Sequence, residues 1–286
     1  MRYSIYKKTE QLLFSQMEIS ELGEFGLISQ LTSDIKLENE SSIKGVGDDC
    51  AILAPAEGMR TLVTTDLLME GVHFDLTYVP LYCLGYKAVM VNLSDVYAMG
   101  GTPRQITVSL AISRRFRVED IAEIYRGMRM ACAKHHVDIV GGDTTSSFTG
   151  LAISITAIGE ARPEEIVCRD GAQDTDLICV SGNLGAAYMG LQLLERERAV
   201  YNQQLAEAKK SGNKDEMARL QDFQPDVSGR EYLLERQLKP EARADIIATL
   251  RQAGIHPTSM MDISDGLSSE LMHICTQSHV GCRVYE

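Results

Sequence analysis

Several features that define other protein classes are missing from this chain of 286 residues. Its cysteines are scattered and none forms a CxxC pair, which indicates reduced thiols rather than a zinc site or a disulfide framework. No uninterrupted apolar run approaches the length of a membrane span, and the first residues lack the apolar segment of a signal peptide. We therefore expect a soluble protein located in the cytoplasm.

Basic residues are also scarce relative to acidic ones. The chain has 28 Lys and Arg against 40 Asp and Glu, and its formal net charge is -12. A nucleic-acid-binding surface would need basic clusters, so this balance argues against one. The balance does not exclude phosphorylated small molecules, because metal ions can mediate their binding.

The common nucleotide-binding and hydrolase motifs are absent as well. There is no GxxxxGK[ST] P-loop, no GxGxxG dinucleotide fingerprint, no GxSxG elbow and no HExxH metal motif. A nucleotide would have to be bound by a different arrangement.

Strand-like and helix-like segments alternate along the first part of the chain. Short apolar runs bounded by turn residues predict strands at 50–55, 59–68, 104–113, 137–142 and 150–161. Apolar spacing predicts helices at 23–35, 84–99 and 118–136. Beyond residues 163–171 the pattern changes, and we predict a strand at 176–182, a helix at 186–198, and a strand that runs into a helix at MMDISDGLSSELMHIC.

This pattern predicts an α/β (α+β) fold with two domains, which suits the length of the chain. We expect an extension at 1–20, an N-terminal domain at 21–165 and a C-terminal domain at 166–286. A charged excursion at 196–226 is expected to form solvated helices or a mobile segment. The last residues, SHVGCRVYE, resemble the middle of a strand. We therefore expect the C-terminal domain to be incomplete in this chain.

Aspartates recur in five short motifs: GVGDDCAIL, TTDLLMEGVHF, NLSDVYAMGG, IVGGDTTSS and MMDISDGL. If these motifs met in one cleft, their charges would need neutralising, since two like charges ~4 Å apart repel by ~4 kcal/mol at an effective dielectric near ~20. Oxygen ligands favour hard cations such as magnesium, and magnesium commonly completes its shell with phosphate. The motifs together predict a magnesium and phosphate site.

Most of these motifs also have a simpler structural explanation. Asp48 and Asp49 could be solvated turn residues, and Asp95 could lie on the polar face of a helix. Either Ser264 or Asp265 could be a helix N-cap. IVGGDTTSS alone favours a ligand, because its paired glycines would let a loop backbone approach a phosphate closely.

In order and spacing, the motifs resemble those of the thiamine-monophosphate kinase family, within the aminoimidazole-ribonucleotide-synthetase-like superfamily. The resemblance runs from about Gly23 to the chain end and rests on GVGDDCAIL, TTD with GVHF, YKAVMVNLSDVYAMGG, IVGGDTT and DISDGL. It implies ATP- and magnesium-dependent phosphorylation of thiamine monophosphate to thiamine diphosphate by direct in-line transfer. It also implies a synthetase-like, two-domain fold whose N-terminal mixed sheet forms a homodimer, with ATP in a cleft between the domains.

The resemblance further implies roles for individual residues. Asp143 and Asp262 would be catalytic, and His73 would contact the thiamine phosphate. ATP would be contacted by Tyr125, Gly142, Asp143, Arg169 and Ser264. Several magnesium ions would be held by Asp49, Thr64, Thr65, Asp66, Asp95, Asp143, Asp262 and Asp265. Core packing is at least as good an interpretation of Tyr125, because it borders the apolar face of its predicted helix.

Two departures from the family pattern leave alternatives open. The later GGEDYEL-like motif and a C-terminal aromatic residue, which help to bind the thiamine end, are absent, and the excursion at 196–226 is longer than expected. A related ATP-dependent synthetase, such as a selenophosphate synthetase or a hydrogenase-maturation protein, is the nearest rival. The first would carry a reactive N-terminal cysteine, whereas the first cysteine here is Cys50. A non-catalytic, acidic metal-binding protein would show closely spaced DxDxDG loops, which this chain lacks.

Overall fold

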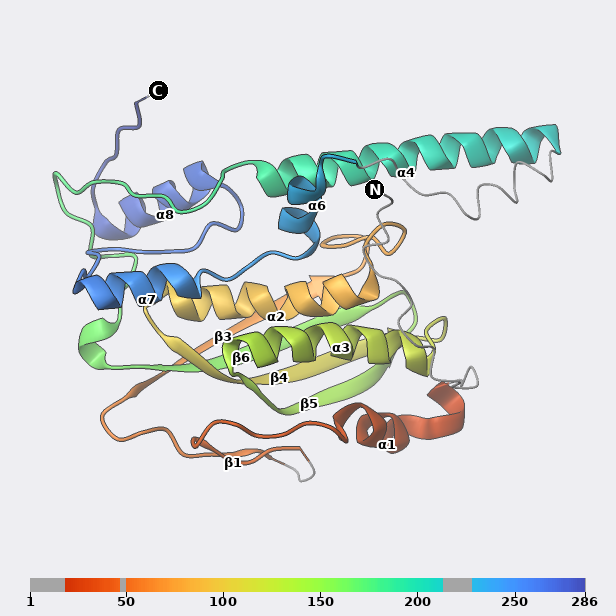
Figure 1. The fold of residues 1–286 in the computed structure, drawn as a ribbon, viewed down its shortest axis with the longest axis horizontal. Helices are drawn as coiled ribbons and strands as arrows, with labels where there is room; N and C mark the ends of the chain where they lie inside the picture. Colours follow the sequence, from red (N-terminus) through yellow and green to blue (C-terminus); the bar gives the residue numbers. More distant parts are fainter. Residues whose placement is uncertain (1–18, 47–49, 213–227, 286) are drawn as a thin grey trace.

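A mixed four-stranded sheet forms the centre of the computed structural model, which describes residues 19–46, 50–212 and 228–285 (Figure 1). The strand order is β3-β6-β4-β5. The strands are β3 (Arg60–Met69), β4 (Thr102–Ser113), β5 (Asp138–Ser147) and β6 (Ala152–Ala161). β6 pairs antiparallel with β3 and with β4, whereas β4 and β5 are parallel. A second, small sheet pairs β1 (Ser42–Lys44) with β2 (Ile52–Leu53).

Helices α2 (Leu81–Ala98) and α3 (Val118–His135) lie side by side over one face of this sheet (Figure 1). Both were predicted from the sequence, and their ends follow the expected signals. Gly100, just beyond α2, has a φ of 72°, and His136 ends α3 in the left-handed conformation. The two helices cross closely at glycines, since a Cβ on Gly127 would lie 1.9 Å from the Tyr82 carbonyl oxygen.

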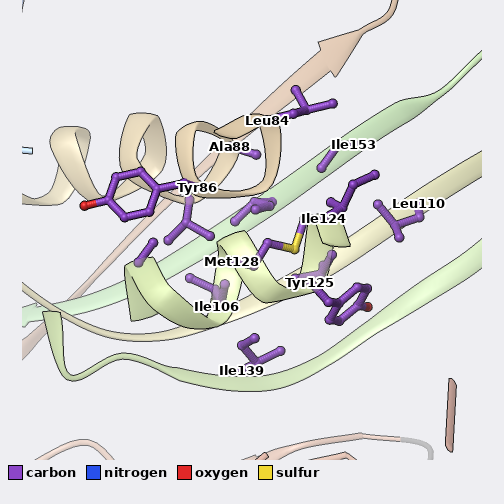
Figure 2. Close-up of a cluster of buried hydrophobic side chains, with 14 of the residues drawn as sticks. Leu84, Tyr86, Ala88, Ile106, Leu110, Ile124, Tyr125, Met128, Ile139 and Ile153 are labelled. Carbon is purple, nitrogen blue, oxygen red and sulfur yellow. The ribbon is translucent and has the colours of Figure 1, made fainter. Parts of the chain in front are cut away.

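The apolar core fills the space between these helices and the sheet (Figure 2). It includes Leu84 and Ala88 of α2, Ile124 and Met128 of α3, and Leu110 of β4, all buried. The other face of β3 is different, because Val63 is 66% exposed and Leu67 is 53% exposed. The strand alternation therefore places apolar side chains on both faces, and those on the face away from the helices stay accessible.

The other helices of the described residues are α1 (Ile19–Thr32), α4 (Ala186–Ser211), α6 (Glu231–Leu238), α7 (Ala244–Ala253) and α8 (Leu267–Ser278), with a 3-10 turn η1 at Pro163–Glu165. α6 contacts α2 and packs along α4, so α4 forms the layer farthest from the sheet (Figure 1). α1 lies against α3 and β5. In the part of the chain that the structure describes, no helix combines the length and apolarity that crossing a membrane requires.

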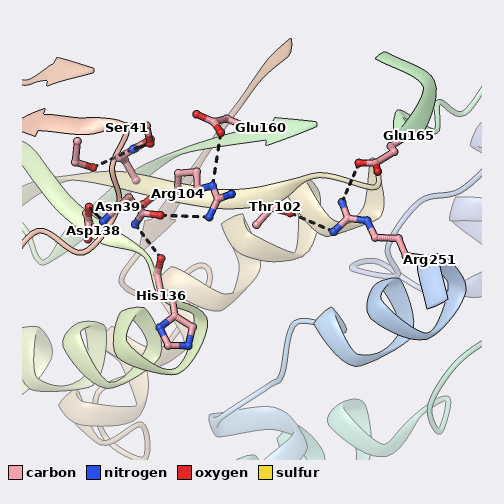
Figure 3. A network of polar contacts seen from close by, with 11 residues as sticks. Asn39, Ser41, Thr102, Arg104, His136, Asp138, Glu160, Glu165 and Arg251 are labelled. Atoms are coloured by element: carbon pink, nitrogen blue, oxygen red, sulfur yellow. Dashed lines mark hydrogen bonds and ion pairs between the residues drawn. The ribbon is translucent and has the colours of Figure 1, made fainter. Parts of the chain in front are cut away.

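A polar network fixes the segment that leads into β1 (Figure 3). The buried carboxylate of Asp138 accepts hydrogen bonds from the backbone N–H groups of Glu38 and Asn39, at 2.8 and 2.9 Å. The Asn39 side chain donates to the carbonyl oxygens of Arg104 and His136. These bonds tie residues 38–39 to β4 and to the start of β5, because each buried polar group finds a partner there.

Three strand predictions in the C-terminal part are wrong. Residues 176–182, the segment before α8 and the segment after it have no regular secondary structure. Leu177 is 89% exposed. An apolar run becomes a strand only if another strand offers hydrogen-bond partners, and none of these segments has one among the described residues.

Other expectations need smaller corrections. The predicted helix at 23–35 begins earlier, as α1, and is kinked at Gly23. The strand expected at 50–55 is reduced to the two residues of β2. The helix expected at 186–198 continues to Ser211, so the first part of the charged excursion is a regular helix. Residues 213–227 of that excursion lie outside the described residues.

Candidate active site

Three aspartates from distant parts of the chain meet beside α2. Asp66 lies in β3, Asp95 lies in α2, and Asp262 lies in the loop that precedes α8. The hydroxyl of Thr64 donates a 2.6 Å hydrogen bond to Asp95 Oδ2, and the hydroxyl of Ser94 donates a 2.7 Å hydrogen bond to Asp262 Oδ2. Since residues two apart in a strand share a face, Thr64 and Asp66 both point toward α2. We call Asp66, Asp95 and Asp262 the aspartate triad.

The pKa values of all three triad carboxyl groups are raised. Burial is the largest cause at each, and the charge of a neighbouring triad member adds to it: Asp262 acts on Asp66, Asp66 on Asp95, and Asp95 on Asp262. The Arg169 guanidinium opposes the rise at Asp95 and Asp262. Mutual repulsion in a half-buried place is the pattern of a site that receives positive charge from a ligand.

Asn92 holds β3 against α2 at the triad. Its side chain is 1% exposed, its Oδ1 accepts from the Asp66 backbone N–H at 3.0 Å, and its Nδ2 donates to the Ala88 carbonyl at 3.0 Å. β3 is an edge strand, and Asn92 supplies an acceptor that a further strand would otherwise provide. The supporting roles of Asn92 and Ser94 were not predicted. The signal for them is the polar pair in NLSD, within an otherwise apolar helix.

Two predicted ligands lie on the other face of the sheet. Thr65 alternates with Thr64 and Asp66, and its hydroxyl donates to the Ile155 carbonyl at 3.1 Å and accepts from Thr156 at 3.1 Å. Asp143 is exposed and is in register with Ser109 of β4, which is also exposed. The neighbouring pair in the register is Gly142 and Val108, and Val108 is buried. Since adjacent residues of a strand face opposite sides, Asp143 lies on the face away from the helices. The structure therefore does not bring the side chains of Thr65 and Asp143 to the aspartate triad.

The glycine-rich segment that we predicted as a phosphate-binding loop is part of a strand. Gly141 and Gly142 belong to β5 and pair with Thr107 and Val108 of β4. A Cβ on Gly142 would lie 1.9 Å from the Val108 carbonyl oxygen. The loop prediction is wrong, because Gly142 permits the close approach of two strands rather than a turn.

His73 and Arg169 lie near the triad. His73 is exposed, its Nδ1 accepts the Met69 backbone N–H at 3.0 Å, and its charge lowers the pKa of Asp66 against the larger effect of burial. Arg169 is exposed and close enough to influence both Asp95 and Asp262. Both are thus placed where a phosphorylated ligand at the triad could meet them.

The other predicted site residues have different surroundings. Ser264 and Asp265 are exposed just before α8, and neither caps it, because the N-cap is Gly266 with no side-chain hydrogen bond. Tyr125 is buried in the core, and burial raises its pKa to about 12. That placement matches the core-packing interpretation. Asp49 lies outside the described residues.

The donor chemistry of the triad suits magnesium bound together with a phosphorylated ligand. Among residues 19–46, 50–212 and 228–285, no three His, Cys, Asp or Glu side chains lie close enough to hold one metal ion. Magnesium, however, is usually held by one or two carboxylates and completes its shell with water and phosphate oxygens. The triad offers hard oxygen donors with unrelieved repulsion, and a closed protein cage is not required.

We predict that Asp66→Asn is more stable than the wild type near neutral pH when divalent metals are removed with a chelator. In the wild type, the pKa of the Asp66 carboxyl group is raised above 3.8 in the folded state. The folded protein therefore binds the Asp66 proton more tightly than the unfolded chain does. Ionisation of Asp66 therefore costs stability as the pH rises, and the gap between the two proteins should close as the pH falls to about 4. Thermal unfolding at several pH values measures this gap. The exposed Asp34→Asn is the matched control, and an equal gap for both variants would contradict the prediction.

Comparison with known proteins assigns the fold to a class. The family model described as AIR synthase related protein, N-terminal domain, matches residues 47–161, which contain the four-stranded sheet, α2 and α3. The N-terminal part of the chain therefore has the fold of AIR synthase related proteins.

Closer relatives narrow this class to one family. The thiamine-monophosphate kinase of Bacillus subtilis is 31% identical over 268 residues, which cover 93% of this chain and 74% of that protein. The thiamine-monophosphate kinase of Aquifex aeolicus is 36% identical over 267 residues, which cover 92% of this chain and 74% of that protein. The crystal structure of the Stenotrophomonas maltophilia thiamine-monophosphate kinase aligns with a TM-score of 0.69 at 30% identity, covering 90% of this chain and 72% of that one. The structure of AaThiL complexed with AMPPCP and TMP aligns with a TM-score of 0.64 at 32% identity, covering 93% of this chain and 74% of that one. The chain belongs to the thiamine-monophosphate kinase family.

Proposed function

We propose that this chain uses ATP and magnesium to phosphorylate thiamine monophosphate, which yields thiamine diphosphate and ADP. The observation that carries the proposal is the aspartate triad, three carboxylates with raised pKa values in a chain of this family. A relative of the same family, AaThiL, binds AMPPCP and TMP together. A related synthetase acting on a non-phosphate acceptor is less well supported, because the two relatives described above, 31% and 36% identical, are thiamine-monophosphate kinases.

Both the donor and the acceptor are phosphate anions, so their repulsion is the main obstacle to transfer. Bound magnesium would neutralise this charge and orient the phosphates. Each magnesium ion would be held by one or two of Asp66, Asp95 and Asp262. Arg169, which already interacts with Asp95 and Asp262, would contact the nucleotide phosphates. His73, beside Asp66, would contact the acceptor phosphate. A strong general base is unnecessary, because the acceptor oxygen is already an anion at neutral pH.

Thr64, Ser94 and Asn92 would fix the geometry of this site. Thr64 and Ser94 each donate to one triad carboxylate, and Asn92 anchors the backbone of Asp66. A hydrogen bond to a carboxylate restricts its orientation and favours its ionised form. These contacts would keep the triad ready for metal without the ligand having to order it.

The assay for this proposal is direct. The purified chain would be incubated with ATP, magnesium chloride and thiamine monophosphate, and thiamine diphosphate and ADP would be measured by chromatography and mass spectrometry. We expect equal amounts of both products, and no product after chelation of the metal. Release of inorganic phosphate without thiamine diphosphate, or transfer to a different acceptor, would contradict the proposal.

Several roles stay in the proposal on the resemblance alone. They are catalysis by Asp143, ATP contacts by Gly142 and Ser264, and metal ligation by Thr65 and Asp265. The Asp143 side chain lies on the sheet face opposite the triad. Asp143→Asn is therefore informative in the same assay. Loss of activity would show that the site draws on both faces of the sheet, and full activity would remove Asp143 from it.

We further infer a cytoplasmic homodimer that forms through the exposed face of the sheet. Val63, Leu67 and Met69 of β3 are exposed on that face, in a row that continues onto Ile158 of β6. Apolar side chains gathered on one sheet face favour burial against a second copy. In the part of the chain that the structure describes, the cysteines form no disulfide, which fits a reducing compartment.

We predict that Leu67→Glu converts the dimer to a monomer. A carboxylate placed at a buried, apolar interface would have to be desolvated without a partner, at a cost of several kcal/mol. Sedimentation velocity measures the outcome directly. The control is Met130→Glu on α3, where the native side chain is also partly exposed, at 49%, but lies on a helix. A dimer that persists in Leu67→Glu, or dissociates equally in Met130→Glu, would contradict the sheet interface.

A further inference from the structure

Helix α8 contacts both chain segments that carry charged groups of the proposed site. One segment is the loop from Asp262 to Asp265, which enters the helix directly. The other is the stretch from Cys168 to Ala172, which contains Arg169. The residues just before the first segment contact the second, since the Met260 backbone N–H donates to the Cys168 carbonyl at 3.3 Å. α8 is therefore placed to set their spacing.

Glu270 fastens the first segment. It lies in the first turn of α8, its side chain is 3% exposed, and its Oε1 accepts the Asp265 backbone N–H at 3.0 Å. Its other oxygen, Oε2, is buried and has no hydrogen-bond partner in the described structure. Burial of an unpartnered carboxylate oxygen costs free energy. The fold tolerates this cost next to the loop that carries Asp262 and Asp265. The N-cap of α8 is Gly266, which provides no side-chain cap for the helix.

Ser278 fastens the second segment from the last turn of the same helix. Its hydroxyl donates to the Arg169 carbonyl at 2.8 Å and accepts from the Ala172 backbone N–H at 3.0 Å. One hydroxyl thus satisfies two backbone groups that lie more than 100 positions earlier in the chain. Because each bond is to backbone, it fixes the path of the chain and leaves the Arg169 side chain available.

We propose that α8 is a rigid brace that positions Asp262 and Arg169 relative to each other, with Glu270 and Ser278 as positioning residues for phosphoryl transfer. The proposal deepens the proposed function and rests on it for the roles of Asp262 and Arg169. The Glu270 end controls the loop that presents Asp262, whose other anchor is Ser94 on α2. The Ser278 end controls the backbone that presents Arg169. A displacement of about 1 Å at such groups can cost as much as ~100-fold in rate.

The test uses four variants and a control. Glu270→Ala and Ser278→Ala remove the two fastenings, whereas Glu270→Gln and Ser278→Thr keep an acceptor and a hydroxyl in their places. Ser268→Ala changes an exposed serine of the same helix. Two readouts are measured on the full chain: hydrogen exchange of the peptides covering 262–266 and 168–173, and kcat and KM for ATP across a magnesium titration.

We expect each alanine variant to loosen one segment. Glu270→Ala should speed exchange at 262–266, lower kcat by about 10-fold or more and raise the magnesium concentration needed for half-maximal rate. Ser278→Ala should speed exchange at 168–173 and raise KM for ATP. Both conservative variants should restore near-wild-type values, which a general loss of stability would not do.

The outcomes separate this proposal from the proposed function. Unchanged exchange in both alanine variants would overturn the brace, whatever the activity. Faster exchange with wild-type kinetics would overturn the positioning role. If the wild-type chain makes no thiamine diphosphate, the proposed function fails, and the segment-specific exchange still decides whether α8 fastens these two segments.

Discussion

Asp262→Asn is expected to lower kcat for thiamine diphosphate formation by about 100-fold or more and to leave the protein folded. Asp262 is the triad member contributed by the C-terminal part of the chain, so under the proposed function it would link the metal to the loop before α8. An amide of nearly the same shape keeps the hydrogen bond from Ser94 but cannot neutralise a cation. Loss of one electrostatic contact to the transferring group costs about 100- to 1,000-fold in kcat.

The same substitution should make the metal-free protein more stable at neutral pH. Asp262 has a raised pKa because of its burial and the nearby charge of Asp95, so removing its charge relieves repulsion. Steady-state kinetics and thermal unfolding of one preparation measure both effects, with Asp34→Asn as a charge-matched control. Activity within a few-fold of wild type would remove Asp262 from the catalytic site. A variant that is inactive because it is unfolded would contradict the stability argument.

The part of the fold that the sequence predicts well is the part with strong local signals. α2 and α3 carry long apolar stripes, and each is followed by a left-handed residue that stops it, Gly100 just beyond α2 and His136 at the end of α3. β4 and β6 are largely buried strands. In each, apolar residues alternate along the strand, and turn residues lie at its ends. In each case the local preference and the tertiary environment agree, so the prediction needs no knowledge of the partner element.

The strands predicted after residue 170 fail for the opposite reason. The run around Leu177 has the apolar composition of a strand, but composition does not supply a hydrogen-bonding neighbour. Strand formation depends on a partner that can lie anywhere in the chain. The same limit explains why α8 was expected but its contacts to Asp265 and Arg169 were not, since Glu270 and Ser278 have no distinctive local motif.

The candidate site shows the same division between chemistry and geometry. The motifs predicted that aspartates would come together, and Asp66, Asp95 and Asp262 do so. What the motifs could not show is the face of the sheet on which each side chain lies, because that depends on strand register. Asp143 falls on the far face through its pairing with Ser109.

Gly142→Ala is expected to cause the largest loss of stability of the substitutions considered, although it adds only a methyl group. The new Cβ would lie 1.9 Å from the Val108 carbonyl oxygen and 2.8 Å from its carbonyl carbon, and both atoms are backbone atoms of the paired strand β4. A side chain can rotate away from such a clash, but a strand in the centre of a sheet cannot move without breaking its ladder. We expect a loss of about 3 kcal/mol, with a fall in Tm of roughly 5–10 °C.

Gly141→Ala is the matched control, because the two glycines are adjacent in β5 but differ in their surroundings. A Cβ on Gly141 would meet only the Thr107 methyl group, at 3.8 Å, which is an ordinary contact. If flexibility of a phosphate-binding loop were the reason for both glycines, the two alanine variants would lose ATP binding alike and differ little in stability. If strand approach is the reason, thermal unfolding will separate them, with Gly142→Ala strongly destabilised and Gly141→Ala close to wild type. Equal unfolding temperatures would contradict the packing of β5 against β4 at Gly142.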